Sequence, residues 1–276
     1  MKKTSLLWII AFIITLAAAY YQRTTGPTYP LKAEVVLDGQ IYIFDLKRSH
    51  GGKEDCIIVL EIHSEDIRGA LVYRKFPTND EWKEIELTRN KENLFGQLPI
   101  QPPAGKMEYY IVLQKGDDSV SVPVEHPVVI RFKGAVPKSI LYTHVLLMFL
   151  SMLLSTMAGL MALTKHPRQK RYGLIAFFLL LASGIILGPL LQNYAFGELW
   201  AGVPLGWDLT DNKTLIALIF WMIAVLGNQK KDRPRLTILA AVIFLVIFSI
   251  PHSMFGSELN YETGEMIQGI ILPMYY

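Results

Sequence analysis

Long apolar stretches alternate with short polar loops at the start and in the second half of the chain. A helix needs about 20 apolar residues to cross roughly 30 Å of hydrocarbon. The candidate stretches are residues 6–20, 140–163, 172–191, 215–226 (extended by the residues before it) and 236–250. The pattern predicts an integral membrane α-helical bundle of about four spans in residues 138–252, preceded by one N-terminal membrane segment.

The N-terminal segment, residues 1–24, fits two interpretations. Two lysines precede its apolar stretch and three alanines, residues 17–19, close it, as in a cleaved signal peptide. Tyr20 and Tyr21 instead suit a retained anchor, because aromatic side chains favour the membrane interface. We favour retention, and under either interpretation the residues that follow are exported.

Residues 25–137 show a different pattern, in which short alternating runs are separated by turn residues. The runs that suit strands are residues 31–36, 41–44, 56–62, 70–73, 82–87, 109–113 and 128–132. Seven or more strands with no helical period predict an exported, antiparallel all-β sandwich. Leu98-Pro99 followed by Tyr109-Tyr110 resembles the tyrosine corner of immunoglobulin-like and fibronectin type III modules, in which a tyrosine hydroxyl bonds back to the backbone.

Basic residues set the orientation of the spans. Two short loops carry them, namely Lys165, Arg168, Lys170 and Arg171 in one, and Lys230, Lys231, Arg233 and Arg235 in the other. Both loops are cytoplasmic by the positive-inside rule. The loop of residues 192–212 and the tail of residues 253–276 are then external. We expect a bacterial-type inner (plasma) membrane protein with a cytoplasmic N-terminus, if uncleaved, and a periplasmic β domain.

Composition agrees with a membrane protein and excludes several chemistries. The 276 residues are 51% hydrophobic with a net charge of +3, and the mean hydropathy is +0.31. Cys56 is the single cysteine, so an internal disulfide or a thiolate-rich metal site is excluded. No basic face for nucleic acid, nucleophile elbow or phosphate-binding loop is present. No catalytic residue is predicted, and a non-enzymatic role is favoured over an enzymatic one.

Two histidines stand out because ionisable side chains at membrane spans are costly and often functional. His144 lies about 9 Å from the outer end of the second span, and His252 follows the last span. Ser151, Ser155 and Gly159 share a face with His144, which predicts that this face contacts other helices. Taken singly, each histidine fits a cap or crosslink between helices through hydrogen bonds. Their shared depth favours a joint role.

The external loop between the third and fourth spans carries the densest aromatic and polar pattern. This Trp-Asp loop, residues 192–212, contains Trp200, Trp207 and Asp208 among glycines and a proline. Asp208, Thr210 or Asp211 can cap the helix that follows. A flat aromatic surface suits a planar ligand, although either tryptophan alone is explained by an interfacial belt.

The motif Gly197, Trp200, Trp207 and Asp208, flanked by the two histidines, resembles the heme-handling membrane proteins of cytochrome c maturation, which carry a Trp-Asp motif. The resemblance covers about 110 C-terminal residues. It departs from the family in having two tryptophans, a stretched interval and four spans rather than six or more. It implies heme as cofactor, with His144 and His252 as iron ligands and Trp200, Trp207 and Asp208 shaping the heme platform.

The resemblance implies heme delivery for cytochrome c assembly or a b-type electron-transfer centre. Heme propionates would be met by Lys138, Lys213 or Arg131, or would face solvent. The alternative is a membrane-anchored structural subunit whose β-sandwich binds another exported or membrane protein. Oligomerisation is compatible with both, because four spans enclose little volume.

Overall fold

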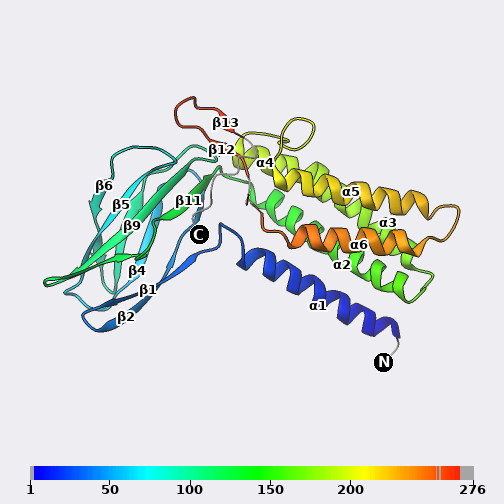
Figure 1. Ribbon diagram of the computed structural model, residues 1–276, viewed down its shortest axis with the longest axis horizontal. Coiled ribbons are helices and arrows are strands. Elements are labelled where there is room, and N and C mark those ends of the chain that lie inside the picture. Colours follow the sequence, from blue (N-terminus) through cyan, green and yellow to red (C-terminus); the bar gives the residue numbers. More distant parts are fainter. Residues whose placement is uncertain (1–2, 253, 255, 268–276) are drawn as a thin grey trace. The chain divides into compact units, whose positions relative to one another are not determined.

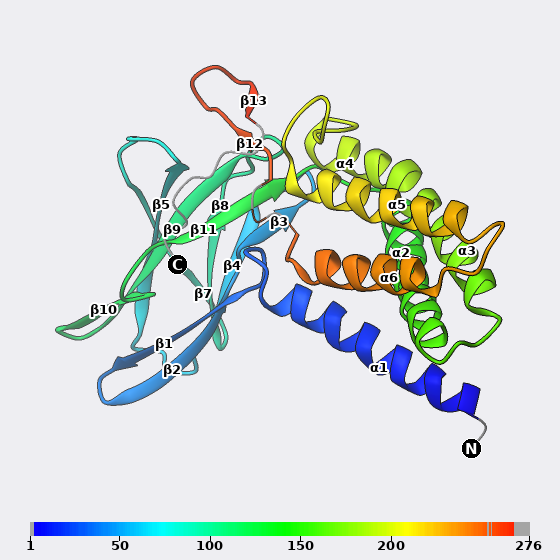
Figure 2. The same cartoon turned by 45° about the vertical axis from the view of Figure 1, so that its right-hand side comes forward.

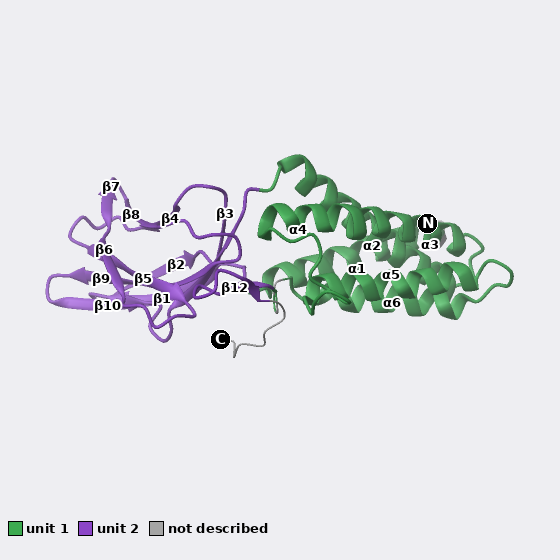
Figure 3. Cartoon of the chain, turned by 90° about the horizontal axis from the view of Figure 1, so that it is seen from above, with its two compact units in different colours: residues 1–27, 136–256 green, residues 28–135, 257–276 purple. Residues whose placement is uncertain are grey.

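The chain contains both helices and β-sheets, arranged in two compact units (Figure 3). The computed structural model describes residues 3–252, 254 and 256–267. Unit 1 comprises residues 1–27 and 136–256, and unit 2 comprises residues 28–135 and 257–276. The helical segments therefore fall in one unit, and the strand-forming region falls in the other together with the C-terminal segment.

Unit 1 is built from helices (Figure 1). They are α1 (Lys3–Thr24), α2 (Lys138–Leu163), α3 (Gln169–Leu180), the π-helix η1 (Leu181–Leu187), α4 (Gly188–Phe196), α5 (Leu209–Gly227) and α6 (Pro234–Ser249). Within the described residues, four helical segments are long and apolar enough to cross a membrane, and α6 is apolar but shorter. The 16 residues of α6 extend roughly 24 Å, less than the thickness of the hydrocarbon.

The predicted third span is one helical segment, Gln169–Phe196, interrupted by the π-helix. Pro189, in the first turn of α4, has no N–H to donate to a carbonyl one turn earlier. In the wider π turn, the N–H of Gly188 donates to the carbonyl of Ser183. Such insertions bend the hydrogen-bond ladder and recur at functional sites. Here the insertion places the Ser183 carbonyl next to α2.

The predicted contact face of α2, with Ser151, Ser155 and Gly159, packs against other helices. Figure 2 shows α2 within the helical unit. The Ser151 hydroxyl donates to a backbone carbonyl of α3 over 2.8 Å. The indole Nε1 of Trp221 in α5 donates to the Ser155 hydroxyl over 3.2 Å. A Cβ atom at Gly159 would lie 2.8 Å from the Cβ of Ala241 in α6, so only glycine permits this approach. Small residues on α2 thus let three helices approach closely.

Unit 2 is built from strands. They are β1 (Leu31–Leu37), β2 (Gln40–Leu46), β3 (Ser49–Gly51), β4 (Cys56–Glu61), β5 (Arg68–Phe76), β6 (Lys83–Glu86), β7 (Thr88–Asn90), β8 (Asn93–Leu98), β9 (Lys106–Lys115), β10 (Asp118–Val122) and β11 (Val128–Lys133), with β12 (Glu258–Leu259) and β13 (Met266–Ile267) near the C-terminus. The larger sheet has the order β3-β11-β9-β5-β6, with β10 paired to β9; β4-β8-β7 and β1-β2 form smaller sheets. All seven predicted runs are strands. The expectation of a purely antiparallel sandwich is wrong in one pair, because β3 lies parallel to β11.

The core of unit 2 is formed by the inward-facing residues of these strands, which alternate with exposed ones along β1 and β4. Tyr109 is fully buried there, and its hydroxyl donates to the carbonyl of Lys47 over 2.9 Å. Burial raises the pKa of the Tyr109 hydroxyl. The bond from a tyrosine to the backbone matches the predicted corner in kind, but its acceptor lies 62 residues upstream.

The C-terminal segment pairs with unit 2. The carboxylate of Glu258 forms an ion pair with Lys106, and the Tyr261 hydroxyl donates to the Lys106 carbonyl over 2.7 Å. Burial raises the pKa of Tyr261 to about 12. The rest of the predicted external tail, residues 268–276, lies outside the described residues, as do residues 253 and 255.

Candidate functional site

His144 projects from the second turn of α2 toward η1. Its Nδ1 lies 2.9 Å from the backbone carbonyl oxygen of Ser183, and its Cε1 would lie 3.8 Å from a Cβ added at Gly188. A carbonyl only accepts hydrogen bonds, so Nδ1 carries the proton and Nε2 carries the lone pair. This bond fixes the tautomer and the orientation of the ring, which is the usual support for a metal-binding histidine.

The Ser183 carbonyl lies within the π-helix and has two donors. It accepts both the N–H of Gly188 and the imidazole of His144. The Ser183 hydroxyl in turn donates to the carbonyl of Leu179 over 2.6 Å and lies 2.8 Å from the sulfur of Met148. The histidine is therefore held by a rigid and well-packed element rather than by a loop.

The Trp-Asp loop is attached to the start of α5 by a set of short hydrogen bonds. Its residues 192–196 continue α4, and its residues 209–212 form the first turn of α5. Asp208, one of the three residues predicted as possible caps, is the N-cap of α5 and accepts the N–H of Thr210 at 2.8 Å. The carboxylate of Asp211 accepts the N–H of Ala201 at 2.6 Å. The amide oxygen of Asn212 accepts the N–H of Val203 at 2.8 Å.

The two tryptophans of the loop have different surroundings. Trp200 is half-buried, and its indole N–H donates to the carbonyl of Val203 over 3.2 Å. Trp207 is 75% exposed and stands beside other exposed apolar residues of the loop, including Leu205. A substitution at Gly202 is excluded, because its Cβ would lie 2.7 Å from the Cβ of Asp211. The loop therefore has a fixed base and an exposed aromatic tip.

Two consecutive residues of α5, Lys213 and Thr214, contact the end of α6, which precedes His252, and η1, which bonds His144. A Cβ at Gly184 in η1 would lie 2.5 Å from Cγ2 of Thr214, so α5 and η1 touch one residue away from the Ser183 carbonyl. The buried Lys213 donates from Nζ to the carbonyl of Ile250 over 2.8 Å, two residues before His252. The second turn of α5 thus contacts both η1 and the end of α6.

The histidines themselves are placed differently. The ring of His144 is half-buried and bonded to η1, whereas His252 is exposed in the turn after α6. Among the described residues, the ring nitrogens of His144 contact η1 and not His252. Two of the three expected propionate partners are occupied: Lys213 bonds the carbonyl of Ile250, and in unit 2 Arg131 bonds that of Ser257. Lys138 is exposed.

Sequence reasoning missed three features. The partner of His144 is the backbone carbonyl of Ser183, which no side-chain pattern reveals, although Pro189 signals an irregular turn in the third span. The only metal ligands predicted were His144 and His252, yet ligand atoms of Glu61, His63 and Glu92 lie within 4.8 Å of one another on the surface of unit 2. Glu61 ends β4 and His63 follows two residues later, so this i, i+2 spacing was the available signal.

The third missed feature is a pocket of about 240 Å³ between α3, α5 and α6, at the end of the bundle that carries the basic loops. Its lining residues come from three helices.

Comparison with protein-family models, with curated proteins and with solved structures gives no match for this chain. The function is therefore inferred from the residues and their geometry.

Proposed function

We propose that the chain is an integral membrane protein whose helical unit binds heme at the end that carries the Trp-Asp loop. The observation that carries the proposal is the imidazole of His144, which is oriented by the Ser183 carbonyl with the lone pair on Nε2. A neutral imidazole held in this way is a good axial ligand for iron. His252 is the proposed second ligand, because Lys213 fixes the chain two residues before it.

The proposed role of the Trp-Asp loop is to cover one side of the macrocycle. Trp207 offers an exposed aromatic face, while Asp208 and Asp211 hold the loop in place from its base. The buried residues that hold the loop are used in hydrogen bonds, so propionates are expected to face solvent or the exposed Lys138. When bound, heme supplies an iron centre that can be transferred or can pass electrons; its delivery for cytochrome c assembly and b-type electron transfer both fit this arrangement.

Absorbance spectroscopy tests the proposal directly. The full chain is purified in detergent and titrated with hemin, and oxidised and dithionite-reduced spectra are recorded. We expect a Soret band at one heme per chain and sharp reduced α and β bands, as for two nitrogen ligands. His144→Ala and His252→Ala should each lose or shift these bands, and His144→Ala should weaken heme binding about tenfold or more, within the range for loss of metal-site residues.

His166→Ala is the matched control, because His166 lies in the α2–α3 loop at the other end of α2 and its ring accepts a local backbone N–H from Arg168. Its spectrum should equal that of the wild type. Absence of a Soret band after hemin addition, or a band that survives both the His144 and the His252 substitutions, contradicts the proposal.

A second candidate function, a membrane-anchored subunit that binds another protein through the proposed sandwich, is favoured by one observation in unit 2. The outward face of the β1-β2 ribbon carries Val36, Ile41 and Ile43, each more than half exposed, with Val36 and Ile41 directly opposite each other. The edge strand β4 adds Ile57 and Val59, both 44% exposed. Apolar side chains gathered on an outward face and a sheet edge are typical of protein-binding surfaces.

Chemical crosslinking in native membranes tests this second candidate. We expect one discrete crosslinked species with the wild type, and its loss in the double variant Ile41→Lys/Ile43→Lys. Ile100→Lys, which changes a partly exposed isoleucine in a loop of the same unit, is the control and should keep the species. Equal crosslinking in all three proteins contradicts a binding role for the ribbon.

A further inference from the structure

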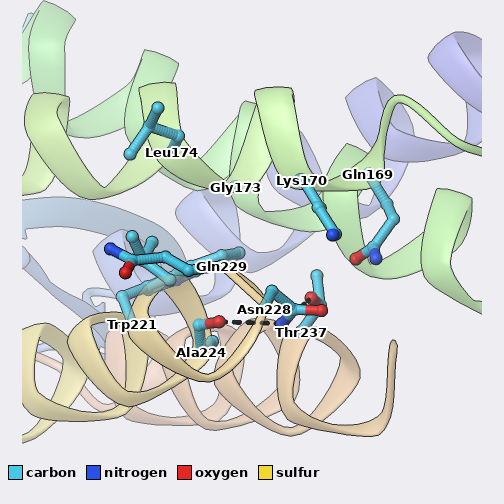
Figure 4. Close-up of a pocket in the computed structure, with 10 residues that line it drawn as sticks. Gln169, Lys170, Gly173, Leu174, Trp221, Ala224, Asn228, Gln229 and Thr237 are labelled. Atoms are coloured by element: carbon cyan, nitrogen blue, oxygen red, sulfur yellow. Dashed lines mark hydrogen bonds between the residues drawn. The ribbon is translucent and has the colours of Figure 1, made fainter. Parts of the chain in front are cut away.

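A pocket opens between α3, α5 and α6 near the end of the bundle opposite the Trp-Asp loop along α5 (Figure 4). Its volume is about 240 Å³. Three helices line it: α3 through Gln169 and Gly173, α5 through Trp221 and its C-cap Asn228, and α6 through Thr237. It lies wholly within unit 1.

The walls of the pocket change from polar to apolar along the helices. The residues at the helix ends are polar, including Gln169, Lys170 and Asn228. Further into the helices the lining is apolar, with Leu174 one turn beyond Lys170 and the ring of Trp221 about two turns from Asn228. A lipid molecule changes from polar to apolar in the same direction, because its headgroup lies at the end of a membrane span and its acyl chains lie along the middle of the span.

Gln169 supplies an acceptor that the protein does not use. Its side chain is 95% buried, since the residue retains 5% of its exposure, and among the described residues its Oε1 has no hydrogen-bond partner. Figure 4 shows the side chains of Gln169 and Lys170 extending from α3 toward α5 and α6. The neighbouring Asn228 is fully used, bonding Ala224, Thr237 and the N–H of Arg233. Buried acceptors normally have a donor, so the geometry calls for one from a ligand.

The charge around the pocket selects an anion. Residues 164–171 and 228–235 carry eight basic side chains against one acidic, Asp232. Lys170 forms an ion pair with Asp232, yet its side chain remains 39% exposed and its ammonium has three donors. Basic pockets between spans are recognised binding sites for anionic lipid headgroups.

We propose that this pocket binds the headgroup of an anionic phospholipid that also carries a hydroxyl, as phosphatidylglycerol does. A headgroup hydroxyl donates to Oε1 of Gln169, the phosphate contacts the ammonium of Lys170, and the start of an acyl chain packs on Leu174 and Trp221. The proposal assumes that the helices of unit 1 lie in a membrane, and it is independent of heme binding. The shared chemistry is glycerol phosphate, which a lipid or a free solute can offer.

Native mass spectrometry of the full chain, released from detergent micelles, measures the affinity for each lipid. Phosphatidic acid has the phosphate without the headgroup hydroxyl, and phosphatidylethanolamine has a donor without net charge. We expect phosphatidylglycerol to bind about fivefold more tightly than phosphatidic acid, the ratio for one hydrogen bond, and both to bind more tightly than phosphatidylethanolamine. Gln169→Leu should remove the preference for phosphatidylglycerol over phosphatidic acid, and Lys170→Ala should weaken both anionic lipids alike.

Lys231→Ala is the matched control, because it removes one charge from the same basic surface without changing the lining of the pocket. It should keep the fivefold preference. Equal binding of phosphatidylglycerol and phosphatidic acid by the wild type, or a preference that persists in Gln169→Leu, overturns the role of Gln169. If phosphatidylethanolamine binds as tightly as the two anionic lipids, the inference that the basic charge selects an anion is overturned. Displacement of the lipid by free glycerol phosphate at equal concentration assigns the pocket to a soluble solute and overturns the lipid.

Discussion

The two ends of α5 differ in whether the buried polar side chains have hydrogen-bond partners. At its start, Asp208, Asp211 and Asn212 each accept a backbone N–H, and the buried Lys213 donates to a backbone carbonyl. At its far end, Asn228 is equally well used, but Gln169 across the pocket has a buried oxygen with no partner among the described residues. One end uses its polar side chains to build the fold, and the other leaves an acceptor for something else.

The difference separates structural polar residues from candidate ligand-binding ones. A buried polar group without a partner costs free energy, so folding alone does not favour it. At the start of α5 the polar side chains bond the loop and the helix, and the proposed ligand His144 is held separately by the Ser183 carbonyl. At the far end the unused group itself lines the pocket. Substitutions that remove partners from one end and not the other test this comparison.

The largest effect is expected from Asp211→Ala. The carboxylate of Asp211 is buried and accepts the N–H of Ala201, which is itself fully buried. Alanine leaves that N–H without a partner, so the free energy of unfolding should fall by about 1–3 kcal/mol. Denaturant or thermal unfolding in detergent measures it. Asp211→Asn keeps an acceptor oxygen, so its free energy of unfolding should fall by less. Equal decreases in the two variants would show that the hydrogen bond to Ala201 does not support the loop.

Gly184→Ala should have the next largest effect. The added Cβ would lie 2.5 Å from Cγ2 of Thr214, so η1 and α5 must separate. We expect a loss of about 1–2 kcal/mol in unfolding free energy from overpacking, relative to the control Gly188→Ala. At Gly188 the nearest atom to an added Cβ is 3.5 Å away, which is an ordinary contact. Both variants replace a helical glycine by alanine, so the gain in helix propensity is the same in each and cancels in the comparison. Equal stability of the two variants contradicts the close approach of η1 to α5.

Asp208→Ala should cost about 1 kcal/mol, the usual effect of losing an N-cap. The side chain of Asp208 accepts from the N–H groups of Thr210 and Asp211 in the first turn of α5. Asp208→Ser keeps a capping oxygen and should restore most of the loss. If the Asp208→Ser and Asp208→Ala proteins are equally destabilised, the carboxylate of Asp208 acts through its charge near Lys213 rather than as a cap.

Local sequence patterns predicted most of the helices and strands. Contacts between residues far apart in the sequence determined strand β8 and the pairing of the strands. The seven strands and the helices were visible because alternation and apolar length are local signals. Strand β8 was missed because Gly96 interrupts its pattern; in the structure a Cβ there would lie 2.6 Å from Leu87, so glycine is needed for packing between strands distant in sequence. The parallel pairing of β3 with β11 is likewise invisible along the chain.

The candidate site was predicted in part for the same reason. The cap at Asp208 follows from neighbouring residues and was predicted. The support of His144 depends on a carbonyl 39 residues away that also accepts the N–H of Gly188, and every residue has a carbonyl. Gln169 was overlooked because it lies in a basic loop sequence that suggests solvent, whereas its burial comes from helices that are far away along the chain.

The smallest expected effect is the most direct test of the comparison. Gln169→Leu removes an acceptor that has no partner among the described residues, so without added lipid its unfolding free energy should be unchanged or raised by up to about 1 kcal/mol. Asn212→Leu removes an acceptor that is bonded to the N–H of Val203 and should be destabilising. Adding phosphatidylglycerol should raise the unfolding temperature of the wild type more than that of Gln169→Leu, because a ligand stabilises only the state that binds it. A destabilised Gln169→Leu protein, measured without lipid, would mean that the oxygen serves the fold after all and that the two ends of α5 are alike.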